Sequence, residues 1–247
     1  MGRASAVLTT PRIAAFIALA AGLGVYYGVH ESLWYAPSVW WDIAFLGFVL
    51  IPAVFGLVYL ALPLWPTPPL QLALLGVAFL ALGFILQYAG AVGAANFAKL
   101  AAMTAIAWLF LHFFEDVSWV VLVALLVPWV DAYSVWRGPT HHIVTHEQHV
   151  FTTLSFAFPV PGQNGAANLG LPDLLFFGLF LGAAARFKLR PFWTWLCLTA
   201  SIGITMALAT QFVVGGLPAL PLLSVGFLLP NVDLLWREMR KPRPADA

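Results

Sequence analysis

Two aspartates lie inside apolar stretches of this chain, where a carboxylate is costly to bury. Asp131 stands six residues before Arg137, and Asp173 stands about five residues inside the following apolar run. A carboxylate at the centre of a membrane-spanning helix costs about 2.5–3.5 kcal/mol on insertion scales, so such residues indicate a functional site. Two carboxylates a few ångströms apart share a proton, and such a pair can deprotonate a water while protonating a carbonyl oxygen. Both residues are therefore candidate catalytic residues.

The composition shows in which solvent these carboxylates lie. Of 247 residues, 62% are hydrophobic and only 9% are charged, against roughly 25% charged in soluble domains, and the mean hydropathy is +0.92. A folded monomer buries only about three quarters of its surface even at ~300 residues, so most of this chain must face lipid. This excludes a soluble enzyme and a nucleic-acid-binding protein. The single cysteine, Cys197, excludes an intramolecular disulfide.

Apolar runs of about 20 residues predict an all-α polytopic membrane protein with about eight transmembrane helices. The runs lie at about 13–29, 43–63, 70–89, 97–114, 117–137, 169–187, 192–213 and 217–236. One long connection divides the chain. We expect a helix block over 1–137 that ends in the Asp131 helix, an external polar loop over 138–168, and a three-helix block over 169–247.

The basic residues predict the orientation in the cell membrane. With eight spans, only Lys99 and Arg137 fall on one side. The other side carries Arg3, Arg12, Arg186, Lys188, Arg190, Arg237, Arg240, Lys241 and Arg243. Because positive charge is enriched on the cytoplasmic side, we expect both termini in the cytoplasm.

A third feature lies at the depth of the two aspartates. The last span begins with Gly215-Gly216-Leu217-Pro218-Ala219-Leu220-Pro221, in which two prolines leave backbone groups unpaired. Irregular backbone at membrane depth is tolerated only where it lines a protein-enclosed or watery cavity. The sequence thus predicts that three helices bring two acids and an opened backbone together.

These segments resemble the presenilin and signal peptide peptidase family of intramembrane aspartyl proteases. That family's pattern is Tyr-Asp, then Gly-x-Gly-Asp, then Pro-Ala-Leu; here the corresponding segments are Val130-Asp131, Gly170-Leu171-Pro172-Asp173 and Pro218-Ala219-Leu220. The stretch 131–137 looks like the microbial presenilin-type members. The resemblance covers about residues 117–236, and the earlier helices match only as hydrophobic spans.

The resemblance implies a presenilin-like helical bundle, with nine helices in the family, and an endopeptidase that cleaves within the membrane. Asp131 and Asp173 would be the catalytic general acid and base. Substrates would be transmembrane helices of single-span proteins or signal-peptide remnants, and neither a cofactor nor a metal is required. The implied substrate-binding residues are Gly170, Leu171, Pro172, Pro218, Ala219 and Leu220.

Two positions depart from the family pattern. Val130 replaces the tyrosine before the first aspartate, so a supporting hydroxyl must come from Tyr133 if it is present. Pro172 replaces the glycine before the second aspartate, which is acceptable if Pro172 opens the helix that carries Asp173. A helix amino end would also favour the ionised form of Asp173.

One segment of the long connection has the composition of a strand. Residues 150–158 are β-branched and aromatic with partial alternation, so they could pair with an extended substrate, as strand-forming segments do in the family. The alternative is a loop that rests on lipid.

Other functions fit parts of the pattern. A proton-coupled transporter could use the same aspartates as a relay, but it predicts inverted repeats. A prepilin-peptidase-like protease would not predict Pro-Ala-Leu, and a family member with an inactive site would keep the helices alone.

His141, His142, His146 and His149 lie in the long loop, where His146-Glu147-Gln148-His149 is one residue short of a zinc-protease motif.

Overall fold

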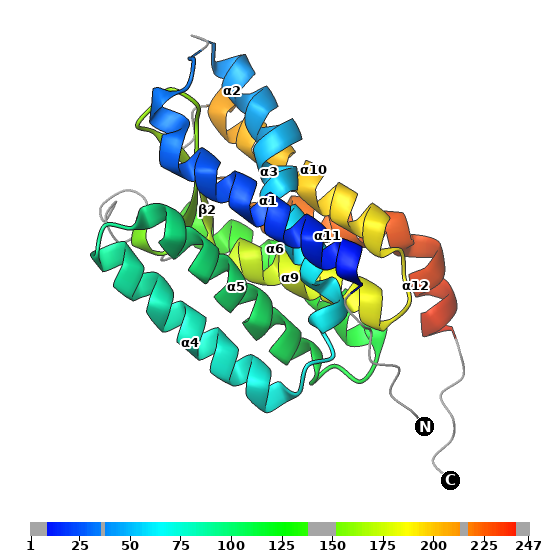
Figure 1. The fold of residues 1–247 in the computed structure, drawn as a ribbon. Helices are drawn as coiled ribbons and strands as arrows, with labels where there is room; N and C mark the ends of the chain where they lie inside the picture. The colour runs from blue at the N-terminus through cyan, green and yellow to red at the C-terminus, as the bar shows by residue number, and fades with distance from the viewer. Residues whose placement is uncertain (1–8, 36–37, 138–151, 213–216, 241–247) are drawn as a thin grey trace.

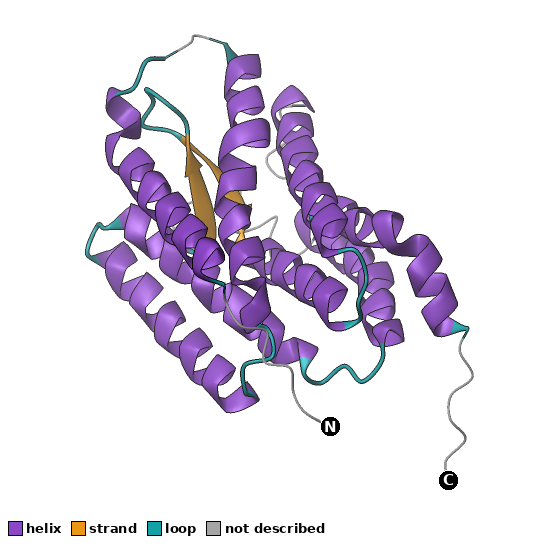
Figure 2. Ribbon diagram, turned by 45° about the vertical axis from the view of Figure 1, so that its right-hand side comes forward, coloured by secondary structure: helices purple, strands orange, loops and turns teal. Residues whose placement is uncertain are grey.

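The computed structural model describes residues 9–35, 38–137, 152–212 and 217–240. Helices make up nearly all of the regular structure, and one pair of short strands makes up the rest (Figures 1 and 2). The prediction of an all-α membrane protein is confirmed at this level, because several long helices are apolar.

The first part of the chain forms five long helical stretches. The second stretch is continuous from Val39 to Leu64 but includes a π-helical turn, η2, and ends in a 3-10 turn, η3. The elements are α1 (Thr10–Val29), η1 (His30–Ser32), α2 (Val39–Phe45), η2 (Leu46–Leu50), α3 (Ile51–Ala61), η3 (Leu62–Leu64), α4 (Pro69–Tyr88), α5 (Val92–Leu111) and α6 (Val117–Arg137).

The second part begins with the strand pair and continues as helices. Several helices have proline in their first turn. Proline is tolerated there because an N–H in the first turn has no intrahelical acceptor, so its absence costs no hydrogen bond. The elements are β1 (Ser155–Pro159), β2 (Ala166–Gly170), α9 (Leu171–Arg186), α10 (Pro191–Phe212), α11 (Leu220–Leu228), η4 (Leu229–Asn231) and α12 (Val232–Met239).

Six helical stretches in the described part of the chain are long and apolar enough to cross a membrane, so the expected count of eight is only partly confirmed. The α9 helix has 16 residues, or about 24 Å at 1.5 Å per residue, against a ~30 Å hydrocarbon core. The last expected span is divided at η4, which contains Pro230, into α11 with nine residues and α12 with eight.

The α9 helix joins the two expected blocks into one core. It packs against α5, α10 and α11 (Figure 1). Phe177 of α9 stacks on Phe55 of α3 with ring centroids 4.0 Å apart, and Phe180 stacks on Phe227 of α11 at 4.9 Å. All four rings are buried. The blocks 1–137 and 169–247 are therefore not separate packing units.

The strands form an antiparallel hairpin that runs directly into α9 (Figure 2). Phe156 and Phe158 are fully buried, and they pack against Phe97 of α5 and Phe55 of α3. The expectation of a loop over 138–168 is thus wrong for residues 155–159 and 166–168, which form strands. Alternate aromatic side chains of β1 enter the core instead. Residues 138–151 lie outside the described residues, including all four histidines of the predicted loop.

Candidate active site

Asp173 lies in the first turn of α9. Gly170, in extended backbone conformation, precedes the helix, and Pro172 lies in its first turn. Pro172 therefore opens the Asp173 helix, as expected for proline in place of glycine. The carboxylate lies against Gly170, because a Cβ added there would be 3.3 Å from Asp173 Oδ2.

Asp131 lies in α6, three residues after Pro128, and its carboxylate reaches the start of α11. The Leu220 N–H donates a 3.0 Å hydrogen bond to Asp131 Oδ2. The first N–H groups of a helix have no intrahelical acceptor. Both carboxylates therefore lie at the amino end of a helix, that of Asp173 at the start of α9 and that of Asp131 at the start of α11. A helix amino end thus does not show which of the two carboxylates is ionised.

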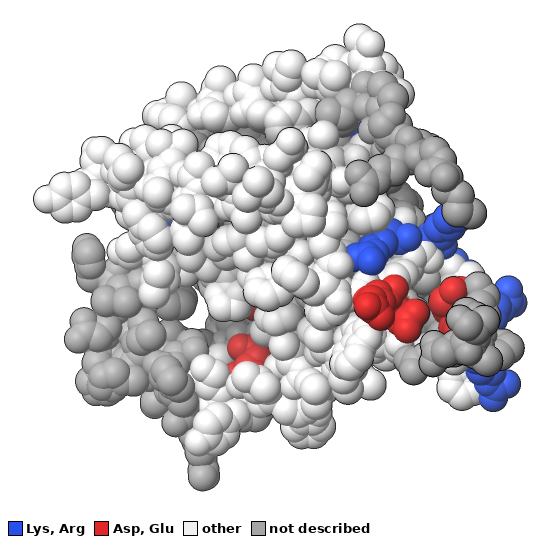
Figure 3. All heavy atoms as spheres, turned by 90° about the horizontal axis from the view of Figure 1, so that it is seen from below, with Lys and Arg blue, Asp and Glu red and all other residues white. Residues whose placement is uncertain are grey.

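The two carboxylates are neighbours in the structure. Asp131 acts electrostatically on Asp173, both residues are half-buried, and the three helices that carry the site, α6, α9 and α11, contact one another. Seen from below, basic and acidic atoms gather on the right of the protein, and a separate group of acidic atoms is visible at a hollow in the otherwise uncharged part of that face (Figure 3). Two carboxylates that interact in this way disfavour ionisation of both at once.

The other predicted site residues differ in accessibility. Pro218, Ala219 and Leu220 are buried at the start of α11, and Leu171 is buried at the start of α9. Pro172 is exposed and Gly170 is half-buried. The segment around Pro218 therefore contributes the Leu220 N–H to Asp131, while its side chains pack into the core.

Tyr133 does not support Asp131. Its side chain is 68% exposed, because a residue two positions along a helix projects to a different face. The expectation of a replacement hydroxyl at Tyr133 is therefore wrong. The hydrogen bond to Asp131 within the described residues comes from the backbone of Leu220 instead.

Side chains from α1 and α5 bond the outward-facing carbonyl groups of β1 and the Ala157 N–H. The carbonyl oxygens of β1 accept hydrogen bonds from Tyr26 (Pro159 O, 2.7 Å), Tyr27 (Ala157 O, 2.8 Å) and Lys99 (Ser155 O, 3.0 Å). The Asn96 amide bonds both the N–H and the carbonyl of Ala157. The expected strand in 150–158 is confirmed for residues 155–158, but side chains of the protein itself cover the outer edge of β1.

The free edge of the hairpin belongs to β2. Backbone hydrogen bonds join Val160 to Gly165 at one end of the hairpin and Leu171 to Leu154 at the other end. Because every second residue of β2 points its N–H and carbonyl groups toward β1, the residues that do so are 167 and 169. The N–H and carbonyl groups of Ala166 and Asn168 face the other way. Among the described residues no partner is present for them, and both residues are at least partly accessible.

The residues that hold the hairpin were missed at the sequence level. Tyr26, Tyr27 and Asn96 lie in apolar runs with no motif around them. Lys99 carried a signal, since a charge inside a span indicates function by default, but the sequence placed it at the external membrane edge. It is instead fully buried within α5.

The described histidines have local structural roles. His30 Nδ1 lies 3.1 Å from the Tyr27 carbonyl, and His112 Nδ1 lies 2.8 Å from the Trp108 carbonyl. Both residues therefore close helix ends. Within the described ranges, no cluster of three or more histidine, cysteine, aspartate or glutamate residues has the arrangement of a metal site.

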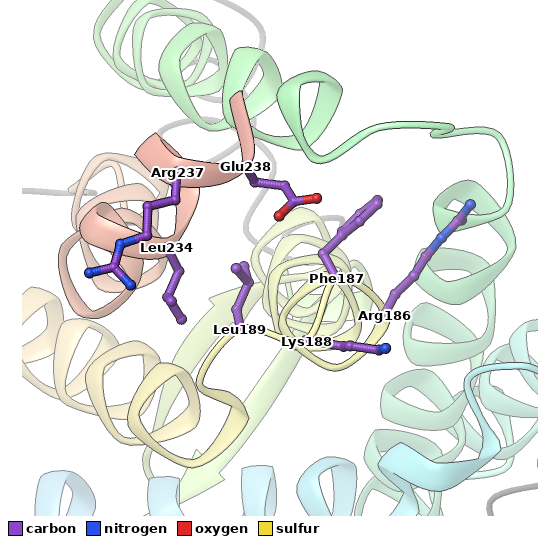
Figure 4. A pocket seen from close by; sticks show the side chains of 7 residues that line it. All are labelled: Arg186, Phe187, Lys188, Leu189, Leu234, Arg237 and Glu238. Carbon is purple, nitrogen blue, oxygen red and sulfur yellow. The ribbon is translucent and has the colours of Figure 1, made fainter. Parts of the chain in front are cut away.

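A pocket of about 550 Å³ lies away from the aspartates, between the α9–α10 connection and α12. Lys188 and Arg237 line opposite sides of it and point away from each other, and the Glu238 carboxylate lies over its centre (Figure 4). Because the cations diverge and an acid faces the opening, the pocket does not gather positive charge, and we assign it no ligand.

No protein-family model, curated protein or solved structure matches this chain.

Proposed function

We propose that this protein is an intramembrane aspartic endopeptidase that hydrolyses peptide bonds within transmembrane helices. The observation that carries the proposal is the neighbouring pair of Asp131 and Asp173, with Asp131 bonded to the backbone at Leu220. Three segments distant in sequence supply the two aspartates and the backbone N–H that bonds Asp131. Each of the three segments also resembles one of the three motifs of the family pattern.

The chemistry needs a water between the two carboxyl groups. Asp131 accepts a backbone hydrogen bond from Leu220, so we assign it the carboxylate that takes a proton from the attacking water. Asp173 then protonates the carbonyl oxygen as the C–O bond forms. Collapse of the tetrahedral intermediate breaks the C–N bond, and the leaving amine takes a proton from the pair. One water is consumed, and a carboxyl group and an amine are formed.

A helical substrate must unwind before this reaction, since its amides are shielded by their own hydrogen bonds. We propose that the unwound segment pairs with the free edge of β2 at Ala166 and Asn168, because added strands gain main-chain hydrogen bonds. The strand continues through Gly170 into the Asp173 helix, so a substrate paired there would extend toward the carboxylates.

We also propose that both termini lie in the cytoplasm and that the substrates are single-span membrane proteins or signal-peptide remnants. The guanidinium of Arg12 bonds the carbonyls of Tyr59 and Leu60, at the end of α3. Tyr59 in turn packs on Phe192, next to the basic segment 186–190. The described basic residues near both ends of the chain thus share one end of the bundle, as the positive-inside rule favours for the cytoplasmic side.

The test uses purified protein in detergent with a labelled single-span peptide. Mass spectrometry should find new termini inside the span. Asp131→Asn and Asp173→Asn should each abolish these products, a hydroxyl-containing transition-state isostere should block their formation, and Asp233→Asn should cleave like the parent. Cleavage retained in both site variants would overturn the proposal. Proton-driven solute uptake in vesicles that depends on both aspartates, without cleavage, would establish a transporter instead.

A further inference from the structure

Lys99 is fully buried in α5, about 10 Å along the helix from Val92. A lysine inside a span is costly and is retained where its ammonium has a definite partner. Its stem lies against α4, because a Cβ added at Gly83 would be 3.2 Å from Lys99 Cγ. This close approach directs the amine to the end of α4 and to the hairpin.

The Lys99 ammonium bonds two neutral oxygens. It donates to Gln87 Oε1 on α4 and to the Ser155 carbonyl at the start of β1, both at 3.0 Å. No carboxylate in the described part of the chain forms an ion pair with it. An ammonium has three donors and no acceptor, and a hydrogen bond from a charged donor is about twice as strong as a neutral one. Lys99 is therefore a strong tether for Ser155.

Ser155 connects this tether to the candidate active site. It pairs with Gly170 across the hairpin, and its hydroxyl donates to Asn168 Oδ1 at 3.1 Å. Gly170 in turn lies against the Asp173 carboxylate, since a Cβ added there would be 3.3 Å from Asp173 Oδ2. A slip of β1 against β2 by one residue would place every side chain on the opposite face, so the site depends on this register.

We propose that Lys99 is a positioning residue for the aspartate pair: its ammonium fixes Ser155, and the strand pairing carries that constraint to Gly170 and the Asp173 carboxylate. The role of the pair rests on the proposed protease function, while the constraint on the hairpin does not. The same tether holds β2 with its free edge toward the substrate.

The first measurement is hydrogen–deuterium exchange of the substrate-free protein. Lys99→Met fills a similar volume but has no donor. Amides of residues 155–170 should exchange about tenfold faster or more, as expected for loss of a charged hydrogen bond, while α4 and α5 keep their protection. Thr104→Val is the matched control, because Thr104 is also buried on α5 and its hydroxyl has no hydrogen-bond partner within the described residues. It should leave the hairpin unchanged.

The second measurement is the cleavage assay above. Lys99→Met should lower kcat by about 100-fold, since a displacement of about 1 Å at a catalytic group has that effect, with a much smaller change in KM. Lys99→Arg, which keeps a cationic donor, should recover part of the lost kcat and hairpin protection. Thr104→Val should cleave like the parent.

Two results would overturn the positioning role. One is unchanged hairpin exchange and unchanged kcat in Lys99→Met. The other is a loss of protection in α4 and α5 equal to that in the hairpin, which would make Lys99 a general packing residue. Absence of cleavage by the unaltered protein is a separate outcome that overturns the proposed function, and the exchange data would still decide whether Lys99 holds the hairpin.

Discussion

The Leu220 N–H donates a 3.0 Å hydrogen bond to Asp131 Oδ2, although 89 residues separate the two in sequence. The bond joins α6 to the amino end of α11, where backbone donors have no intrahelical acceptor. It gives the Asp131 carboxylate a fixed orientation that does not depend on another side chain. The segment Pro218-Ala219-Leu220 therefore contributes to the site through its backbone.

Removal of this donor should impair catalysis without unfolding the protein. Leu220→Pro lacks the N–H, and proline is tolerated in the first turn of a helix. Because a hydrogen bond to a charged group contributes about 1.5–3 kcal/mol, kcat/KM should fall by about 10–100-fold. Leu220→Met keeps the N–H and most of the buried volume and should cleave nearly as well as the parent. Equal losses in the two variants, with equal thermal stability, would show that the donor is not what matters.

Substitution of glycine by alanine should have opposite effects at two glycines, one in the packed contact between α10 and α11 and one on the open face of α1. A Cβ at Gly226 would lie 2.7 Å from Ser201 Oγ and 3.0 Å from the Cys197 carbonyl, which is backbone and cannot rotate away. Gly226→Ala should therefore destabilise the protein by about 1–3 kcal/mol. At Gly22 of α1, a Cβ would meet no described atom within 4 Å, so Gly22→Ala should stabilise by about 0.5–1 kcal/mol. Thermal unfolding in one detergent measures both, and a stabilising Gly226→Ala would contradict the packing.

The ion pair at the basic end predicts a pH dependence of stability. Arg190 donates two 2.8 Å hydrogen bonds to the Asp233 carboxylate, and chiefly this hydrogen bonding lowers the pKa of Asp233 below its ordinary value of 3.8. Because the folded-state pKa is the lower one, the pair stabilises the fold above the ordinary value, and this contribution is lost as the pH falls through the folded-state pKa.

Asp233→Asn should thus have a lower Tm than the parent at about pH 6, and the difference should disappear at a pH below the folded-state pKa. The effect should be small and should weaken in high salt, because both side chains are about two-fifths exposed. A Tm difference that persists unchanged into strong acid would mean that Asp233 acts through packing rather than through charge.

The sequence predicted the parts of the site that depend on local rules. Proline at 172 predicted a helix start, which places Asp173 in a first turn. The prolines at 218 and 221 predicted an opened backbone at the start of the last span, and α11 begins at Leu220. Each of these follows from the missing proline N–H, which acts within a few residues along the chain.

The rest depends on contacts between distant segments. The burial of β1 could not be derived, because its outer-edge partners come from α1 and α5. Tyr133 was placed near Asp131 by proximity in sequence, whereas the helical turn carries it outward. Lys99 was counted with the residues of a membrane edge because apolar length alone fixes neither the depth nor the partner of a charge.

The most direct test of the shared aspartate centre compares single-turnover cleavage rates of Asp131→Asn, Asp173→Asn and the double variant. Residues that act as one catalytic unit lose nearly the whole rate enhancement when either is removed, so the double variant should be no slower than the single ones. Rates that are equally low in all three, with the parent active and Asp233→Asn unaffected, are the predicted result. A single variant that retains substantial cleavage, or losses that multiply in the double variant, would contradict a shared aspartate centre.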